Sequence, residues 1–179
     1  MNRSSIVLAV ITSQLYFIAM LFLISLINST IGLFGLFLFV PTLFLLIPAP
    51  ISPQIGKIMI FMNGLLLDCY YSAPLGLIAF IMLFFSFFIF ENFGATKEIK
   101  ILDTKVLLIS TNIFIHTLLF LLSHNEVLLN SNWSAYKFFA DLVLSCILIF
   151  GMGNLCFLLH KHLLKIICQF SIRSDKSNS

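Results

Sequence analysis

The sequence has very few charged residues for its length. Of its 179 residues, ten are Lys or Arg and seven are Asp or Glu, so charged residues make up 9% of the chain. Soluble globular domains carry roughly 25% charged residues. Here 60% of the residues are hydrophobic, 21 are Phe, and the mean hydropathy is +1.11. This composition excludes a soluble catalytic domain, a disordered tail and a nucleic-acid-binding protein, and it predicts an integral membrane protein.

The sequence also lacks the short motifs that carry enzyme and cofactor chemistry. It has no G-x-S-x-G, no H-E-x-x-H, no P-loop and no G-x-G-x-x-G. Its four cysteines are never spaced as C-x-x-C, which indicates buried or lipid-facing thiols. Cys156, His160 and His162 are near one another in the sequence, but a fourth metal ligand is not evident. We therefore expect no enzyme activity, no cofactor and no metal site.

Long apolar runs dominate what is present. A membrane-spanning helix needs about 20 mostly apolar residues. The runs predict an all-α polytopic membrane protein, in which residues 1–179 form one transmembrane domain with six helices in one bundle. The expected helices are 6–27, 31–47, 55–71, 75–90, 106–122 and 138–159, followed by a basic tail, 160–179. Pro41 lies inside the second expected helix and predicts a kink there.

Lys and Arg are distributed unevenly between the expected loops. If six helices alternate across the membrane, nine of the ten Lys and Arg fall on the side of the termini, and only Lys137 falls on the other side. Cytoplasmic loops are enriched in Lys and Arg. The sequence therefore predicts that both termini are cytoplasmic. The basic tail fits either a segment lying on the cytoplasmic membrane surface or a simple topological anchor.

Asp68 is the first candidate functional residue. If Lys57 marks the inner boundary of the third helix, a rise of about 1.5 Å per residue lifts Asp68 roughly 16 Å, past the midplane of a ~30 Å core. Ionisable residues at such depth are costly and mark functional sites. Gly64 lies four residues earlier, on the same helix face. Two interpretations remain: Asp68 serves a function or contacts a partner, or the helix is short and Asp68 already meets the outer water and caps the turn over Tyr70–Pro74.

Asp141 and His116 are the other ionisable candidates. Asp141 follows Lys137 by four residues, which favours a local ion pair, although a site shared with Asp68 is an alternative. His116 lies midway along the fifth expected helix, near Asn112. An interhelical hydrogen bond is one interpretation of His116, and a proton relay with Asp68 is the other.

Residues 56–76 carry a family resemblance. They read G-K-I-M-I-F-M-N-G-L-L-L-D-C-Y-Y-S-A-P-L-G. This segment resembles the central signature of the MreD family of bacterial rod shape-determining proteins, in which a Gly precedes an Asp by four residues and a Leu-Gly pair follows at the same offset. The chain length, the six expected spans and Pro41 in the second span are also similar to that family. The sequence departs from the family at Ser72, where a Gly is frequent.

The resemblance implies a non-enzymatic subunit of the cell-elongation machinery, a multi-pass protein of the bacterial inner (plasma) membrane. Such a protein would bind the single-span protein MreC and help couple MreB filaments to peptidoglycan synthesis by RodA and a penicillin-binding protein. The resemblance also implies a helix arrangement similar to that of transporter S-components. It places Gly64, Asp68, Pro74 and Gly76 in the partner-binding groove. We add Asp141 to this predicted partner site and expect membrane lipid around the bundle.

Two other functions fit the composition. One is an S-component-like subunit of a membrane transporter that binds a small molecule such as a vitamin, which would need a pocket near the outer helix ends. The first expected helix offers only Ala9 and Ser13 as a small-residue face for a coupling subunit. The other is a proton-linked transporter that uses Asp68 and His116. The chain has few ionisable groups that could carry protons, and it lacks the internal sequence repeat that is typical of many transporters.

Overall fold

The structure is a computed structural model that describes residues 3–48, 53–92, 101–123 and 135–177. Within these ranges the chain is helical and has no β-strand. The five α-helices are α1 (Arg3–Ile31), α2 (Pro53–Tyr70), α3 (Leu77–Asn92), α4 (Ile101–Ser123) and α5 (Ala135–Ser177). Two short 3₁₀ helices, η1 (Gly32–Phe34) and η2 (Pro41–Leu46), lie between α1 and α2.

Three helical stretches have the length and apolar composition to cross a membrane. They are Ile6–Phe34, Lys105–Leu122 and Tyr136–Ile166, and α3 adds a shorter apolar stretch, Leu77–Phe87. Their outward faces carry large apolar side chains, such as Leu15, Phe22 and Ile147, which are more than half exposed. Contiguous exposed apolar surface of this kind is unusual on a soluble monomer, whereas it suits helices surrounded by lipid.

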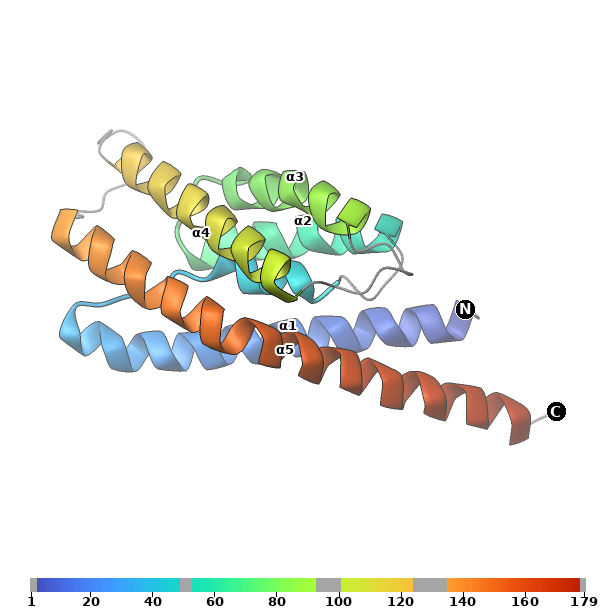
Figure 1. Ribbon diagram of the computed structural model, residues 1–179. Coiled ribbons are helices and arrows are strands. Elements are labelled where there is room, and N and C mark those ends of the chain that lie inside the picture. Colours follow the sequence, from blue (N-terminus) through green and yellow to red (C-terminus); the bar gives the residue numbers. More distant parts are fainter. Residues whose placement is uncertain (1–2, 49–52, 93–100, 124–134, 178–179) are drawn as a thin grey trace.

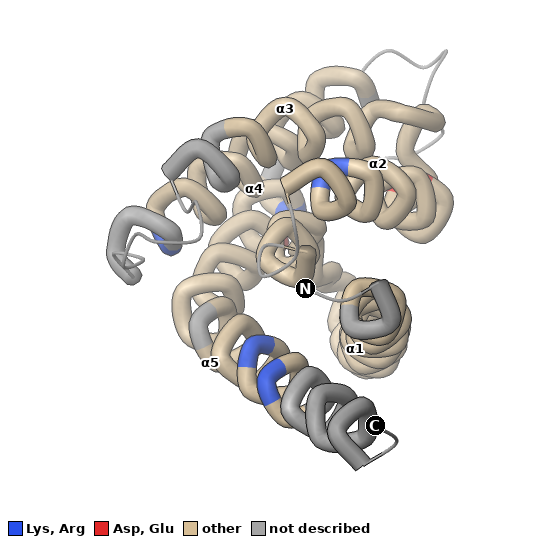
Figure 2. Tube along the Cα trace, turned by 90° about the vertical axis from the view of Figure 1, so that its right-hand side faces the viewer, with Lys and Arg blue, Asp and Glu red and all other residues tan. Residues whose placement is uncertain are grey.

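The helices run roughly antiparallel in the order of the sequence (Figure 1). α1 and α5 lie side by side, α2 and α3 form a hairpin, and α4 packs against α5. The N-terminus of α1 and the C-terminus of α5 lie at the same end of the molecule. Figure 2 looks onto this end, where Lys or Arg residues appear on α2 and α5.

The helix predicted over residues 31–47 is wrong. α1 continues to Ile31, and the chain then makes a 3₁₀ turn that closes at Gly35, whose φ of +72° is in the left-handed region. Residues 36–40 have no regular secondary structure, and η2 follows. Proline removes a backbone donor and disfavours helical geometry in the residue before it. Val40, which precedes Pro41, accordingly has a φ of −132°.

The tail predicted to begin at residue 160 also differs. α5 is one helix of 43 residues that continues without a break through the end of the expected sixth span. At about 1.5 Å per residue it is roughly 65 Å long, more than twice the thickness of the ~30 Å hydrocarbon core. The other expected helices correspond to α1, α2, α3 and α4, with ends shifted by a few residues.

The hydrophobic core surrounds residues 36–48, which contain the 3₁₀ helix η2 but no α-helix and are called the non-helical segment in this sense. Residues 38–48 are all buried, and every helix contributes apolar side chains that pack around them. The packed residues include Phe17 and Ile24 of α1, Ile60 and Leu67 of α2, Ile78 and Met82 of α3, Leu108 and Ile115 of α4, and Ile149 of α5. In Figure 1 this segment passes back through the middle of the bundle from the turn after α1. The second expected helix is therefore replaced by a buried segment that has the 3₁₀ helix η2 and no α-helix.

Candidate functional site

Asp68 closes the hairpin between α2 and α3. Its Oδ2 atom accepts a hydrogen bond from the amide of Gly76 at 2.8 Å, and its Oδ1 atom accepts one from the amide of Ile78 at 2.7 Å. The Ile78 amide lies in the first turn of α3, where helical N–H groups have no partner within the helix, and the Gly76 amide directly precedes that helix. A carboxylate at a helix N-terminus also interacts favourably with the helix dipole. The Asp68 side chain is fully buried, so it does not meet outer water as the short-helix interpretation expects, and it caps the start of α3 rather than the turn at residues 70–74.

Gly64 brings the two helices of the hairpin together. A Cβ atom at this position would lie 2.4 Å from the Cα atom of Ala79 in α3 and 2.9 Å from its Cβ atom. Real side chains do not approach so closely, so only glycine permits this contact. Gly64 lies one turn before Asp68 on the buried face of α2. The close approach places α3 where its first amides reach the Asp68 carboxylate.

The turn between α2 and α3 contains two residues with left-handed backbone geometry. Gly76 has a φ of +92°, which suits glycine, and Ser72 adopts a left-handed φ of 53°. The amide of Leu77 donates to the carbonyl of Pro74 at 3.0 Å as α3 begins. The Leu75 side chain, in contrast, is 79% exposed. Within the Pro74-Leu75-Gly76 motif, Leu75 is therefore the residue whose side chain has little internal packing.

A second polar network holds the non-helical segment. Asn28 of α1 accepts a hydrogen bond from the Leu38 amide at 2.7 Å and donates one to the Leu38 carbonyl at 3.1 Å. The amide of Phe37 donates to Oδ1 of Asp141 at 2.8 Å, and the amide of Phe39 donates to Oγ of Ser145 at 2.9 Å. Four side-chain hydrogen bonds from α1 and α5 thus replace the hydrogen bonds that a helix would have made.

The network continues on the other side of the segment. The amide of Val40 donates to the hydroxyl of Tyr71 at 3.2 Å, and Nδ2 of Asn112 in α4 donates to the carbonyl of Phe39 at 3.0 Å. The hydroxyl of Thr42 donates to Oδ1 of Asn112 at 3.3 Å. Non-helical backbone at membrane depth persists only where protein or water satisfies its polar groups, and here side chains satisfy them.

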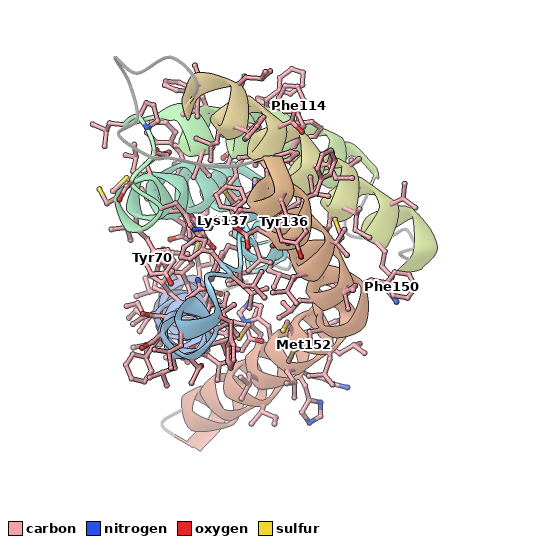
Figure 3. All side chains as sticks on the ribbon, turned by 90° about the vertical axis from the view of Figure 1, so that its left-hand side faces the viewer. Tyr70, Phe114, Tyr136, Lys137, Phe150 and Met152 are labelled. Carbon is pink, nitrogen blue, oxygen red and sulfur yellow. The ribbon has the colours of Figure 1, made fainter. Side chains whose placement is uncertain are left out.

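Asp141 and Asp68 do not share a site in this structure. Asp141 binds the segment after α1, whereas Asp68 binds the start of α3. The local ion pair of Asp141 with Lys137, which the spacing of four residues predicts, stays a prediction. Figure 3 views the end opposite to the termini, where Tyr136 and Lys137 lie at the start of α5 and Tyr70 lies beside α1.

The buried histidines lie in separate surroundings. His116 packs between the rings of Phe39 and Phe138, with centroid distances of 4.9 and 5.0 Å. His160, which the sequence presents only as a candidate metal ligand, has its Nε2 atom 3.2 Å from the hydroxyl of Ser13 in α1. No group of three or more His, Cys, Asp or Glu residues in the described ranges is arranged to hold a metal ion.

Sequence reasoning missed the side chains that hold the segment. From the sequence, Asn28 marks a break between helices, Tyr71 is expected at the membrane interface, Asn112 is a neighbour of His116 and Ser145 has no role, whereas in the structure all four bind the segment. One signal was available: each is a polar residue in or beside an apolar helix. Their common target, however, was expected to be a helix and thus to need no side-chain partners.

The predicted partner residues therefore mainly make contacts within the protein itself. Gly64, Asp68, Gly76 and Asp141 are buried, and Pro74 is partly buried. Their effect on a partner would act through the shape of the hairpin and the segment, because little of their own surface is accessible. Direct partner contact by these five residues stays a prediction.

Comparison with protein-family models, with curated proteins and with solved structures finds no match to this chain.

Proposed function

We propose that this chain is a non-enzymatic membrane subunit of the bacterial cell-elongation machinery, of the MreD type. It would bind MreC and help couple MreB filaments to the peptidoglycan synthase. One observation carries the proposal: the four positions of the family resemblance act together in the hairpin of α2 and α3. Gly64 sets the helix contact, Asp68 caps α3, and Pro74 and Gly76 shape the turn.

This cooperation explains why the spacing of the motif matters. Asp68 reaches the amides of Gly76 and Ile78 only because the turn between the helices has a fixed length and geometry. An apolar sequence in random order would rarely combine a glycine at a helix contact, a capping carboxylate four residues later and a left-handed glycine eight residues after that. The hairpin therefore supports the resemblance at the level of side-chain roles.

The path of the chain supports the proposed orientation. α1, the non-helical segment, α2, α3, α4 and α5 cross the bundle in turn, so that both termini lie at one end (Figure 1). The nine-to-one distribution of Lys and Arg between the two sides assumes the same number of crossings, six. We accordingly propose that this end faces the cytoplasm of a bacterial cell, with the hairpin turn facing outward.

The first experiment is identification of the partner. We would tag the C-terminus, solubilise native membranes in a mild detergent and identify the proteins that copurify. Recovery of a single-span wall-machinery protein is the expected result. Recovery of an ATPase pair with a coupling membrane subunit would overturn the proposal in favour of a transporter S-component.

Two variants then separate direct contact from hairpin stability. Leu75→Ser changes an exposed side chain within the motif, and Leu121→Ser is its matched control, an exposed Leu near the end of α4. We expect Leu75→Ser to weaken partner binding roughly 3- to 30-fold, the range for one interhelical contact, with an unchanged melting temperature. Asp68→Ala should lower both partner recovery and melting temperature, without abolishing membrane insertion. Equal partner recovery from all variants would show that the hairpin is not the binding surface.

A further inference from the structure

A small cavity lies where α1, η2 and α5 meet. Its volume is about 10 Å³, which is about the space that one water molecule needs in a protein interior. Its wall is largely apolar and includes Met20 of α1, Leu43 and Ile47 of the non-helical segment, and Phe157 of α5. Two polar side chains, Tyr16 and His160, also line it. The cavity is remote in sequence from the hairpin motif, and the proposed function does not use it.

The two ring nitrogens of His160 differ in their surroundings. Nε2 lies 3.2 Å from the hydroxyl of Ser13 in α1. Nδ1 is buried, and no atom of the described residues forms a hydrogen bond with it. The whole residue is 1% exposed, so bulk solvent does not reach the ring. Because buried polar groups are normally paired with protein or with ordered water, Nδ1 needs a partner that the side chains around it do not supply.

Two other polar groups at the cavity have hydrogen-bonding capacity to spare. The Tyr16 hydroxyl donates to the carbonyl of Cys156 at 2.9 Å, so its oxygen can still accept a hydrogen bond. The backbone of Ile47 lies close to the His160 ring, but no direct hydrogen bond of good geometry joins it to Nδ1. A buried water typically has two to four polar partners. Nδ1 of His160, the Tyr16 hydroxyl and the Ile47 carbonyl meet that number.

The position of Ile47 gives such a water a structural task. Ile47 directly follows η2, and the last carbonyls of a helix have no partner within it. At the other end of the non-helical segment, residues 37–40 bond directly to side chains of α1 and α5, among others. Backbone of this kind persists at membrane depth only where protein or water satisfies its polar groups. The end that leads into α2 therefore favours a water-mediated contact.

We propose that the cavity between α1, η2 and α5 binds a single structural water, which joins Nδ1 of His160 to the carbonyl of Ile47. The water shares a hydrogen bond with Nδ1 and donates one to the carbonyl, while Ser13 remains the partner of Nε2. It thereby fixes the end of the non-helical segment to α5. An empty cavity would leave Nδ1 without a partner, and a larger ligand would not fit. The proposal does not depend on the proposed function.

The first test observes the ring in the unmodified full chain. The chain is isotope-labelled at its histidine ring nitrogens and reconstituted in phosphatidylcholine vesicles. Solid-state NMR then measures magnetisation transfer from water protons to each ring, and the variant His160→Gln assigns the His160 signals. We expect transfer from a bound water to Nδ1 of His160, with the exposed His162 as positive control. Transfer to His162 without transfer to His160 would overturn the proposal.

Two substitutions of His160 then separate the water from the Ser13 contact. An Asn amide can take the place of Nδ1, whereas a Gln amide can take the place of Nε2. The readout is hydrogen exchange at the amides of Leu43 and Ile47, which bond to the carbonyls of Val40 and Phe44. We expect His160→Gln to accelerate this exchange about 10-fold, and His160→Asn to accelerate it less.

Ser13→Ala is the matched control, because it removes the partner of Nε2 and leaves Nδ1 unchanged. We expect exchange at Leu43 and Ile47 to stay close to that of the unmodified chain in this variant. Equal acceleration by His160→Gln and Ser13→Ala would show that no water acts through Nδ1, and the proposal would be wrong. The spectrum of the unmodified chain decides the question even if a His160 variant does not fold.

Discussion

Replacement of Asn28 by Ala tests whether the second crossing is held by side chains. Asn28 accepts a hydrogen bond from the amide of Leu38 and donates one to its carbonyl. Leu38 is 2% exposed and Asn28 is 8% exposed, so water has little access to either group in the variant. Each buried polar group left without a partner costs about 1–3 kcal/mol. The two groups of Leu38 together predict a loss of about 2–6 kcal/mol.

The assay is thermal unfolding of the purified chain in detergent, combined with hydrogen exchange over residues 36–47. For a chain of this size, 1 kcal/mol corresponds to about 2–4 °C, so Asn28→Ala should lower the melting temperature by roughly 5–20 °C. Exchange should accelerate first in the segment. Thr30→Ala is the matched control, because the exposed Thr30 hydroxyl bonds only to carbonyls of its own helix. We expect that control to change stability by less than about 0.5 kcal/mol.

The reasoning fails if Asn28→Ala and Thr30→Ala melt at the same temperature. In a regular helix the amide and carbonyl of Leu38 would bond within the helix, and loss of Asn28 would leave them unaffected. Equal melting temperatures of the two variants, together with unchanged hydrogen exchange in residues 36–47, would therefore support the helix that the apolar run predicts.

Three further predictions address the glycine and carboxylate positions. Gly64→Ala should destabilise the chain by about 1–3 kcal/mol through overpacking, whereas Gly151→Ala, which meets no atom within 4 Å, should be neutral or stabilising by about 0.5–1 kcal/mol; the two melting temperatures measured side by side decide this, and equal values would contradict the contact. Asp68→Ala should cost about 2–5 kcal/mol and Asp68→Asn about half as much, since Asn keeps one acceptor oxygen; denaturant titration monitored by helical circular dichroism checks the order, and equal losses would contradict capping by both oxygens. Asp141→Ala should accelerate hydrogen exchange at residue 37 more than Ser145→Ala accelerates it at residue 39, because a bond to a charged acceptor is the stronger one, and the reverse order would contradict the assignment.

The apolar runs located most of the helices because each run contains its own hydrogen-bond partners. Residues 53–70 and 77–92 fold as helices close to the expected limits, and a helix in lipid satisfies its backbone without any neighbour. The depth of Asp68 in the expected helix indicates a functional or buried carboxylate, but the alternative of a water-exposed cap of the turn at residues 70–74 differs from the buried cap of α3 that the structure has. What the sequence could not supply was the direction of its hydrogen bonds, which depends on how Gly64 seats α3.

The non-helical crossing shows where this reasoning stops. Residues 31–47 are apolar enough for a helix, and Pro41 alone predicts only a kink. Backbone groups of residues 37–40 bond to side chains of Asn28, Tyr71, Asn112, Asp141 and Ser145, the farthest of which is about a hundred residues away in the chain. No pattern in the sequence near residues 36–40 indicates that distant polar side chains bond to this segment of backbone.

The sequence by itself determined that this chain is apolar along most of its length, that its charges gather near the ends of predicted spans, and where helices with internal hydrogen bonds form. Hydropathy and helix geometry act locally, so local sequence suffices for them. Only the tertiary structure decided that residues 36–48 form no α-helix and that the carboxylates of Asp68 and Asp141 accept hydrogen bonds from backbone amides. Both outcomes depend on long-range hydrogen bonds, which exist only after the helices have packed.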